Sequence, residues 1–268
     1  MNPVLNTADA LYLGDIPVDV VFAGTTKVWP KPKVWTPDKL PGLTIWLDAS
    51  QLGLADGAAV SPWPNLAVGG QPGTMVDDSG FSRWPKISTN KLNGKSIVRF
   101  TVSEGRMRMT GTGIELEFTL AYVARMVPGG SYIAGRIVTA TYPPTNFLLG
   151  YWNGFEDVAY STSGAFFTPD NRPASTTNWN LYSADGGIPT NWLPRLFKNG
   201  VLLNSNPTVA GNRGQDGWLS TFNLGGYDAA SSAETCDFEI AEVVMYDHKI
   251  TDIERDTLEQ YLRTKWGL

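Results

Sequence analysis

The chain has 268 residues, a formal net charge of −5 and 42% hydrophobic residues, and its isoelectric point is about 5.0. This length suits either one large β domain or a large domain with a small appendage. An acidic balance without a Lys/Arg run argues against the clustered basic surface of a nucleic-acid-binding protein. A single cysteine, Cys236, excludes an internal disulfide. No apolar run reaches the ~18–20 residues needed to cross a bilayer, so we expect no membrane insertion.

Residues 1–35 are predicted to form a small β segment that ends at the start of a linker. From Ala10 to Trp29 short apolar runs alternate with two turn signals, Gly14-Asp15 and Gly24-Thr25. Two or three strands this short are marginal in isolation. We therefore expect the segment to pair with the main domain, a neighbouring subunit or another protein by strand addition. Proline-rich residues 30–37 predict an extended, stiff linker.

Residues 36–268 have the short alternating stretches and turn signals of an all-β domain. Residues 114–122 alternate apolar and polar side chains and predict one strand. Further strands are expected at residues 96–102, 132–138, 195–198 and 201–203. Asn199-Gly200, between the last two, predicts a β-hairpin with a two-residue turn. No long helix is predicted before residue 251.

Residues 238–246 predict a closing strand that is covered on both faces, because apolar residues occupy both of its alternating sets. One set contains Phe238, Ile240, Val244 and Tyr246, and the other contains Ala241, Val243 and Met245.

A short helix is predicted to follow this strand. Thr251 and Glu254 have the spacing of a capping box, in which each side chain accepts a hydrogen bond from the other residue's backbone amide. Gly267 is expected to end the helix. Apolar residues at helical spacing predict its buried face, namely Ile250, Ile253, Leu258, Tyr261 and Leu262.

This closing strand and helix resemble those of bacterial and phage domains with a concanavalin A-like, laminin-G-like jelly roll. Three further motifs resemble the same family in the same order: residues 40–50 as its first strand, residues 198–202 as a late hairpin, and residues 223–227. Together they span residues 40–268. The resemblance implies an antiparallel β-sandwich with a short C-terminal helix. It implies no single activity, because this fold hosts lectins, glycanases, adhesion modules and spacers.

The N-terminal segment resembles the N-terminal tag of minor tail proteins from long-tailed phages. The matching patterns are L-x-L-G-x-x-x-V from Leu11 to Val18 and V-x-x-G-x-x-x-V-W from Val21 to Trp29. This resemblance implies a virion protein that is made in the host cytoplasm, attaches to other tail proteins through this segment and forms homo-oligomers. The first ten residues lack the basic start and apolar centre of a secretory signal, which agrees with release by lysis.

Nucleophilic and metal chemistry have few candidates in this sequence. The sole histidine, His248, lies in a predicted exposed turn, and Cys236 is expected to be half-buried packing at a strand start. These two residues are too few for a zinc site, which needs three or four such ligands. We expect no cofactor, although oxygen ligands without regular spacing leave a calcium site open at Asp77, Asp78, Asp185 and Asp228.

One acidic motif invites comparison with glycanases of this fold, which place E-x-D-x-x-E on a bulged strand. Residues 237–242 read Asp-Phe-Glu-Ile-Ala-Glu, with the first two acids exchanged. We interpret the motif as structural, because it lies on the closing strand, begins with the shorter acid and gives no sign of a bulge. Glu242 is expected to satisfy donors near the C-terminal helix. We therefore expect no enzyme activity and keep a glycanase as an alternative.

Exposed aromatic rings beside amides form the remaining candidate site. Sugars stack their C–H faces on such rings while amides and carboxylates bind the hydroxyls. The predicted carbohydrate-binding residues are Tyr151, Trp152, Asn153, Trp179, Asn180, Trp192, Tyr227 and Asp228. The resulting hypothesis is a phage tail tip or tail fibre protein whose lectin-like domain binds host surface polysaccharide. The other alternative is an architectural tail protein without sugar binding.

Overall fold

The computed structural model describes residues 12–13, 16–17, 21–23, 26–29, 35–70, 72–76, 84–103, 106–114, 117–131, 135–142, 145–161, 164–167, 173–186, 195–203, 219–226 and 234–268. The chain divides into two compact units, Met1–Thr36 and Pro37–Leu268.

The N-terminal unit contains short strands, as its sequence predicts. β1 (Tyr12–Leu13) pairs antiparallel with β2 (Ile16–Pro17), and β3 (Val21–Ala23) pairs antiparallel with β4 (Thr26–Trp29). The two predicted turn signals fall between the strands of each pair. Among the residues of this unit that the structure describes, there are thus two separate strand pairs, where the sequence predicted two or three strands.

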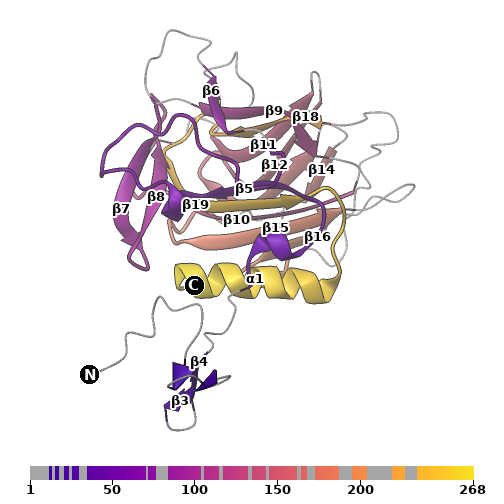
Figure 1. Cartoon of the computed structure of the whole chain (residues 1–268). Coiled ribbons are helices and arrows are strands. Elements are labelled where there is room, and N and C mark those ends of the chain that lie inside the picture. The colour runs from indigo at the N-terminus through magenta and orange to yellow at the C-terminus, as the bar shows by residue number, and fades with distance from the viewer. Residues whose placement is uncertain are drawn as a thin grey trace. The chain divides into compact units, whose positions relative to one another are not determined.

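The larger unit is an antiparallel β-sandwich, which confirms the predicted fold class (Figure 1). The helix-side sheet contains, in spatial order, β17 (Val201–Leu202), β16 (Arg195–Lys198), β15 (Asn180–Gly186), β10 (Phe118–Met126), β19 (Phe238–Tyr246), β8 (Lys95–Phe100) and β7 (Lys86–Leu92), and β5 (Leu43–Asp48) also pairs with β19. The far sheet contains β14 (Gly164–Phe167), β13 (Phe155–Ser161), β12 (Thr145–Trp152), β11 (Arg136–Tyr142), β18 (Leu219–Leu224), β9 (Arg106–Ile114) and β6 (Thr74–Val76). Two 3-10 turns flank β5, η1 (Pro37–Lys39) and η2 (Ala49–Gln51).

The core lies between the two sheets, where the inward-facing side chains of each sheet meet. Within the helix-side sheet, Phe100 and Phe238 stack with ring centroids 4.4 Å apart and an interplanar angle of 9°. Between the sheets, the Tyr122 hydroxyl donates to the Leu149 carbonyl at 2.6 Å. Gly150 leaves room for that hydroxyl, because a Cβ there would lie 1.9 Å from it. The two sheets are thus joined by the packing of their inward-facing side chains and by a direct hydrogen bond.

The predicted hairpin is confirmed. β16 and β17 pair through Lys198 and Val201, and the two turn residues have positive φ, 51° at Asn199 and 86° at Gly200. Asn and Gly tolerate positive φ at both turn positions, which matches the right-handed twist of the paired strands. The predicted strands at 96–102 and 132–138 correspond to β8 and to β11, although residues 132–134 lie outside the described residues.

The single strand predicted over residues 114–122 is wrong. β9 ends at Ile114 in the far sheet, and β10 begins at Phe118 in the helix-side sheet. The apolar–polar alternation continues across this junction, so the periodicity alone does not reveal that the chain changes sheet.

β19 is buried along its whole length, as predicted, but its two faces differ from the prediction. Val123 pairs with Glu242 and the next residue, Ala124, pairs with Ile240, so Ala241 is an extra residue that forms a bulge. The bulge reverses the alternation beyond this point. The core face therefore contains Phe238, Ile240, Val243 and Met245, and the outer face contains Glu239, Glu242, Val244 and Tyr246.

α1 (Asp252–Trp266) has the predicted ends and lies on the outer face of the helix-side sheet (Figure 1). Both capping-box hydrogen bonds form, Glu254 N to Thr251 Oγ1 at 3.3 Å and Thr251 N to Glu254 Oε2 at 2.8 Å, and Gly267 ends the helix with φ 73°. Ile253 is 79% exposed, which corrects its predicted place on the buried face. The buried face consists of Arg255, Leu258, Glu259, Leu262 and Trp266. Within the part of the chain that the structure describes, no helix has the length and apolarity to span a membrane.

Candidate functional site

Two of the predicted sugar-binding residues lie inside the sandwich, which corrects their assignment. Tyr151 is 0% exposed, and its hydroxyl donates to the Ala124 carbonyl at 3.2 Å. Asn180 is also buried, and its Nδ2 donates to that Tyr151 hydroxyl at 3.0 Å. Burial raises the pKa of the Tyr151 hydroxyl well above its usual range. A buried ring offers no face to a sugar, so these residues hold the two sheets together instead.

Trp152 and Trp179 do not form one platform. Tyr151 points into the core from β12, so Trp152, the next residue, lies on the outer face of the far sheet. Asn180 points inward from β15, and Trp179 beside it contacts Arg125 on the outer face of the helix-side sheet. The two indoles are therefore on opposite faces of the sandwich. Asn153 is exposed in the turn between β12 and β13, with φ 52°.

The remaining predicted residues lie outside the described residues. These are Trp192, Tyr227 and Asp228 of the carbohydrate-binding set, together with Asp77 and Asp78 of the calcium set.

Trp179 belongs to a compact three-residue cluster on the outer face of the helix-side sheet. The Arg125 guanidinium carbon lies 5.0 Å from the centroid of the indole, at the distance of a cation–π contact. Arg125 Nε and Nη2 both reach Glu239 Oε2 at 2.7 Å. Arg125 keeps 26% of its side chain exposed, and Trp179 is half-buried. The cluster thus presents an aromatic ring and a fixed guanidinium to solvent.

The segment before Trp179 is held against the far sheet. Glu156 N donates to the Pro173 carbonyl at 3.0 Å, and Ser175 N donates to the Gly154 carbonyl at 2.8 Å. These bonds lead the chain from one sheet to the other and fix the start of β15. Thr176 and Asn178 follow in the chain and are exposed. A hydroxyl and an amide therefore lie three residues and one residue before Trp179 in the sequence.

Glu242 lies on the same outer face as Glu239, three residues further along β19. It lies beneath α1 and so has a different environment from Glu239. Its Oε1 accepts from Trp46 Nε1 at 2.7 Å and from the Tyr261 hydroxyl at 3.0 Å. Its Oε2 accepts from Lys265 Nζ and from Trp266 Nε1, both at 2.7 Å. The carboxylate is 0% exposed and has four donors, which confirms that Glu242 satisfies donors near the C-terminal helix.

Lys265 connects Glu242 to a second buried acid. Its ammonium also donates to Asp48 Oδ2 at 2.5 Å and to the Tyr261 hydroxyl at 3.0 Å. Burial is the main cause that raises the pKa of the Glu242 carboxyl, and the same cause raises the pKa of Tyr261. One ammonium and two carboxylates are thus enclosed between α1, β5 and β19.

Each acid of the motif at residues 237–242 is bound by donors of the protein itself. Asp237 Oδ1 and Oδ2 accept from the backbone amides of Val102 and Ser131, at 2.8 and 2.9 Å. Glu239 is bound by Arg125 and Glu242 by the donors under α1. The strand does contain a bulge, contrary to the sequence-based expectation, and the bulge turns Glu239 and Glu242 to one face. The interpretation of these acids as structural rests on their partners and not on the shape of the strand.

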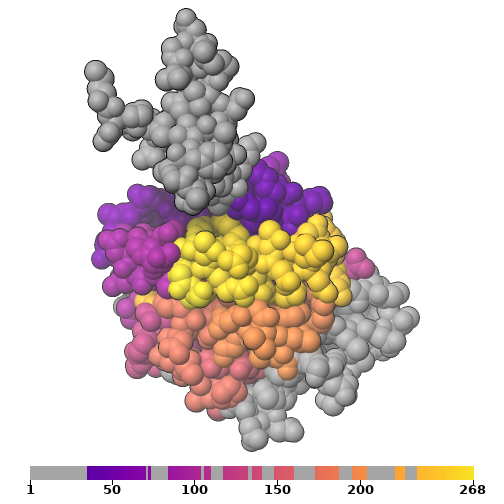
Figure 2. Space-filling view, turned by 90° about the horizontal axis from the view of Figure 1, so that it is seen from below, coloured from indigo at the N-terminus to yellow at the C-terminus, as the bar shows by residue number. Residues whose placement is uncertain are grey.

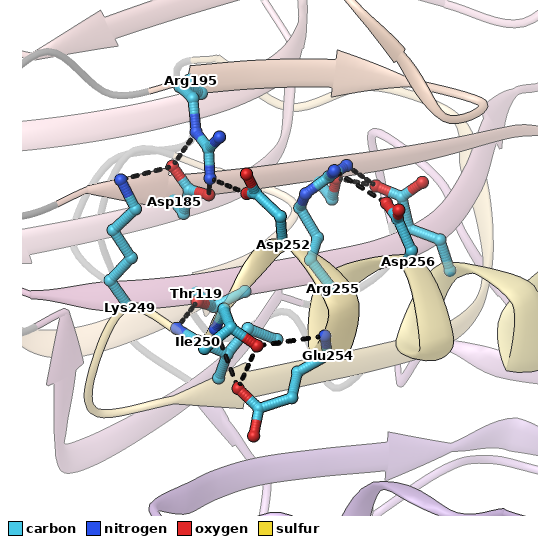
Figure 3. Close-up of polar contacts among 12 residues, drawn as sticks. Thr119, Asp185, Arg195, Lys249, Ile250, Asp252, Glu254, Arg255 and Asp256 are labelled. Atoms are coloured by element: carbon cyan, nitrogen blue, oxygen red, sulfur yellow. Dashed lines mark hydrogen bonds and ion pairs between the residues drawn. The ribbon is translucent and has the colours of Figure 1, made fainter.

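The start of α1 is anchored to the sheet by a second ionic cluster (Figure 3). Arg195 Nε donates to Asp185 Oδ1 at 2.9 Å, and Nη2 of the same residue contacts Asp252 Oδ1 at 2.6 Å. Lys249 Nζ lies 3.9 Å from Asp185 Oδ1. The Arg195 hydrogen bond lowers the pKa of Asp252. Asp185, a candidate calcium ligand, is thus paired with two cations, and no group of three or more possible metal ligands gathers among the described residues.

Among the described residues, His248 and Cys236 each have a contact that does not form a nucleophile–base pair. His248 Nδ1 contacts Asp247 Oδ1 at 2.9 Å in the half-exposed turn after β19. Cys236 is 1% exposed, more buried than predicted, and its Sγ lies 3.6 Å from the Arg136 carbonyl. Burial raises the pKa of the thiol well above its usual range, which disfavours the nucleophilic thiolate.

Comparisons with known proteins identify the fold. No protein-family model and no curated protein matches the chain. Domain 4 of AbnA, a GH43 extracellular arabinanase from Geobacillus stearothermophilus solved in complex with arabinotriose, is 13% identical with a TM-score of 0.52, over 82% of this chain and 97% of that one. Botulinum neurotoxin type C, which depends on two ganglioside molecules to enter cells, is 9% identical with a TM-score of 0.51, over 82% of this chain and 51% of that one. At these identities the likeness shows a shared β-sandwich.

Sequence reasoning found Trp179 but missed its partners. Arg125 points outward from β10, and the residues on either side of it in the chain are apolar. Glu239 occupies the paired position on β19. A charged residue inside an otherwise buried strand is an available signal, because such a residue needs a partner. The sequence does not say which partner, since 54 residues separate Arg125 from Trp179 and 114 separate it from Glu239.

Proposed function

We propose that residues 37–268 form a non-catalytic carbohydrate-binding domain, and that the protein is a phage tail component that presents this domain to the host surface. The observation that carries the proposal is the half-buried Trp179 ring, supported by Arg125 and adjoined by exposed Asn178. A ring of this kind stacks against the apolar face of a sugar while the polar groups bind its hydroxyls. The arabinanase domain was solved in complex with arabinotriose and the neurotoxin interacts with gangliosides, and these partners of similar folds support a sugar as the partner here.

The proposal assigns no catalytic role to the acidic motif. Glycoside hydrolysis needs two carboxyl groups that reach the scissile bond. Glu242 is enclosed beneath α1, where each of its carboxylate oxygens accepts from two donors. Asp237 accepts from two backbone amides. Incubation of the purified protein with host polysaccharide is therefore expected to release no reducing ends. Release that is lost in Glu242→Gln would establish a glycanase instead.

The tail assignment rests on the resemblance of the N-terminal segment. Its short strand pairs cannot bury much surface alone, which favours attachment to another tail protein or to further copies of this chain. Several copies around a tail axis would bind the surface together, so that sites of low affinity give a high overall avidity. The protein is therefore expected in the virion, and light scattering is expected to detect oligomers of the full chain. A strict monomer at high concentration would contradict the oligomer.

Adsorption to host envelope polysaccharide tests the binding proposal. Trp179→Ala is expected to weaken binding by about tenfold, since stacking of this kind contributes about 1–1.5 kcal/mol. Trp179→Phe, which keeps a ring, is the matched control and should retain part of the affinity. Equal binding by wild type and Trp179→Ala would reject this site. No binding by the wild type, together with normal assembly into particles, would favour the architectural alternative.

A further inference from the structure

A row of charged side chains crosses the outer face of the helix-side sheet and ends at Trp179. The strand register pairs Lys86 with Arg99, Arg99 with Glu239, and Glu239 with Arg125. Side chains paired in this way lie next to each other on one face. Their chain neighbours point into the core, which places the row outside; these neighbours are Ile87, Val98, Phe100, Phe238, Ile240, Ala124 and Met126.

The row lies beside α1 and not beneath it. α1 meets this sheet through Ser183, Glu242 and Asp48, all outside the row. In Figure 2 the yellow band of α1 covers only part of this face, with the purple surface of residues near β7 and β8 on one side. The three steps from β7 to β10 span about 14 Å at the usual strand spacing. The row is therefore long enough to meet several units of an extended polymer.

The row carries a positive balance on an acidic chain. Lys86, Arg99 and Arg125 contribute three positive charges, against the single carboxylate of Glu239, whereas the whole chain has a net charge of −5. Glu239 is 4% exposed and already bound by Arg125. Arg99 is exposed, and no hydrogen bond or ion pair engages its guanidinium among the residues that the structure describes. An anionic group can therefore approach Arg99 without displacing a partner.

We infer that this row selects acidic polysaccharides whose sugars carry carboxylates. The inference rests on the proposed function and names its substrate class. The planar guanidinium of Arg99 matches a carboxylate with two parallel hydrogen bonds. Trp179 at the end of the row stacks on a sugar ring, which a simple cationic patch that binds phosphate polymers would not require. The acidic balance of the rest of the chain disfavours a nucleic acid.

Polygalacturonate, a polymer of carboxylated sugars, is a suitable probe for the full chain. The same polymer after reduction of its carboxyl groups to alcohols is the matched ligand control. Binding of polygalacturonate is expected to exceed that of the reduced polymer and to weaken as salt rises. Arg99→Ala should lower the affinity by about threefold to tenfold, with an unchanged unfolding midpoint. Arg99→Lys, which keeps the charge but loses the planar fork, should fall between Arg99→Ala and wild type.

Lys39→Ala is the control for net charge. Lys39 is exposed in η1, where the Pro37 carbonyl accepts from Tyr246 at the opposite end of β19 from Glu239. Its loss should leave polygalacturonate binding unchanged. An effect equal to that of Arg99→Ala would overturn the inference, because it would show that the net charge of the chain, and not the row, determines binding.

The remaining outcomes separate this inference from the proposed function. Equal binding of the native and reduced polymers, with no effect of Arg99→Ala, would overturn the inference and leave carbohydrate binding intact. No binding of either polymer would also overturn the inference, while adsorption to host polysaccharide decides the proposed function independently. Tighter binding of inorganic polyphosphate than of polygalacturonate, lost in Arg99→Ala, would replace the carboxylate assignment with a phosphate polymer.

Discussion

Glu239 and Glu242 lie three residues apart on β19 and point to the same face, yet they serve different regions. Glu242 is enclosed by α1 and accepts from Trp46, Tyr261, Lys265 and Trp266. Glu239 lies in the part of the face beside α1 and is bound by Arg125 alone among the contacts described above. The bulge at Ala241 produces this division by turning both acids outward. In the covered region both oxygens of Glu242 accept from protein donors, and the uncovered region keeps groups that can meet a ligand.

The largest expected effect comes from removing the acid of the covered region. Glu242→Ala should destabilise the fold by about 3–5 kcal/mol, because it leaves two indole N–H groups without their acceptor and removes one of the two carboxylates that bind the enclosed Lys265 ammonium. Glu239→Ala is the matched variant and should cost about 1 kcal/mol or less, since Arg125 is partly exposed to water. Urea unfolding of both variants measures the difference. Equal costs would contradict the division of this face.

A smaller loss is expected from the cation of the uncovered region. Arg125→Ala should destabilise the fold by about 1–3 kcal/mol, because the nearly buried Glu239 loses its partner. The same change removes the cation from the Trp179 ring, so the indole fluorescence should change in the folded state. Arg125→Lys should recover part of the stability without the planar contact. Unchanged fluorescence and stability would show that the cluster does not form in solution.

Loss of the helix cap tests what holds α1 over the covered region. Thr251→Ala removes the acceptor for Glu254 N and should cost about 1 kcal/mol. Thr257→Ala, in the middle of the same helix, should change stability little, because Thr257 Oγ1 only donates back to the Ile253 carbonyl. Thermal unfolding of the pair isolates the cap. A larger cost for Thr257→Ala would mean that the capping box is not what fixes this end.

Much of this organisation was predictable from sequence, because several signals are local. The capping box, Gly267 and Asn199-Gly200 each fix a backbone conformation within a few residues. The prediction that Glu242 satisfies helix donors was also correct, since strand and helix are adjacent in the chain. Two features were not predictable. The bulge at Ala241 has no residue signature, and the alternation of 114–122 hides a change of sheet.

The candidate site was predicted less well than the fold. Tyr151 and Asn180 have the residue types of a sugar site, but the structure uses them as a buried hydrogen-bonded pair. Residue type alone does not distinguish these roles, because both need an aromatic ring near an amide. Trp179 was identified, whereas Arg125 and Arg99 are defined as neighbours only by the strand register.

The smallest expected effect is a difference in pH dependence between the acids. The Thr251 backbone amide lowers the pKa of Glu254, so its stabilisation is present above the unfolded-state value of about 4 and is lost as pH falls through the folded value. Burial raises the pKa of Glu242, so its contribution is present below the unfolded-state value and is lost as pH rises through the folded one.

Urea midpoints measured from acid to neutral pH test these opposite signs. Glu254→Gln should remove part of the loss of stability at acid pH, and Glu242→Gln should remove part of the decline toward neutral pH. The same sign for both variants would contradict the assigned environments.

The most direct test of the account measures stability and polysaccharide binding together in Trp179→Ala, Arg99→Ala and Glu242→Gln. The account predicts that the first two lose affinity with unchanged unfolding midpoints, and that Glu242→Gln loses stability but binds as wild type while it is folded. Undiminished binding by Trp179→Ala and Arg99→Ala, with binding abolished in folded Glu242→Gln, would contradict it.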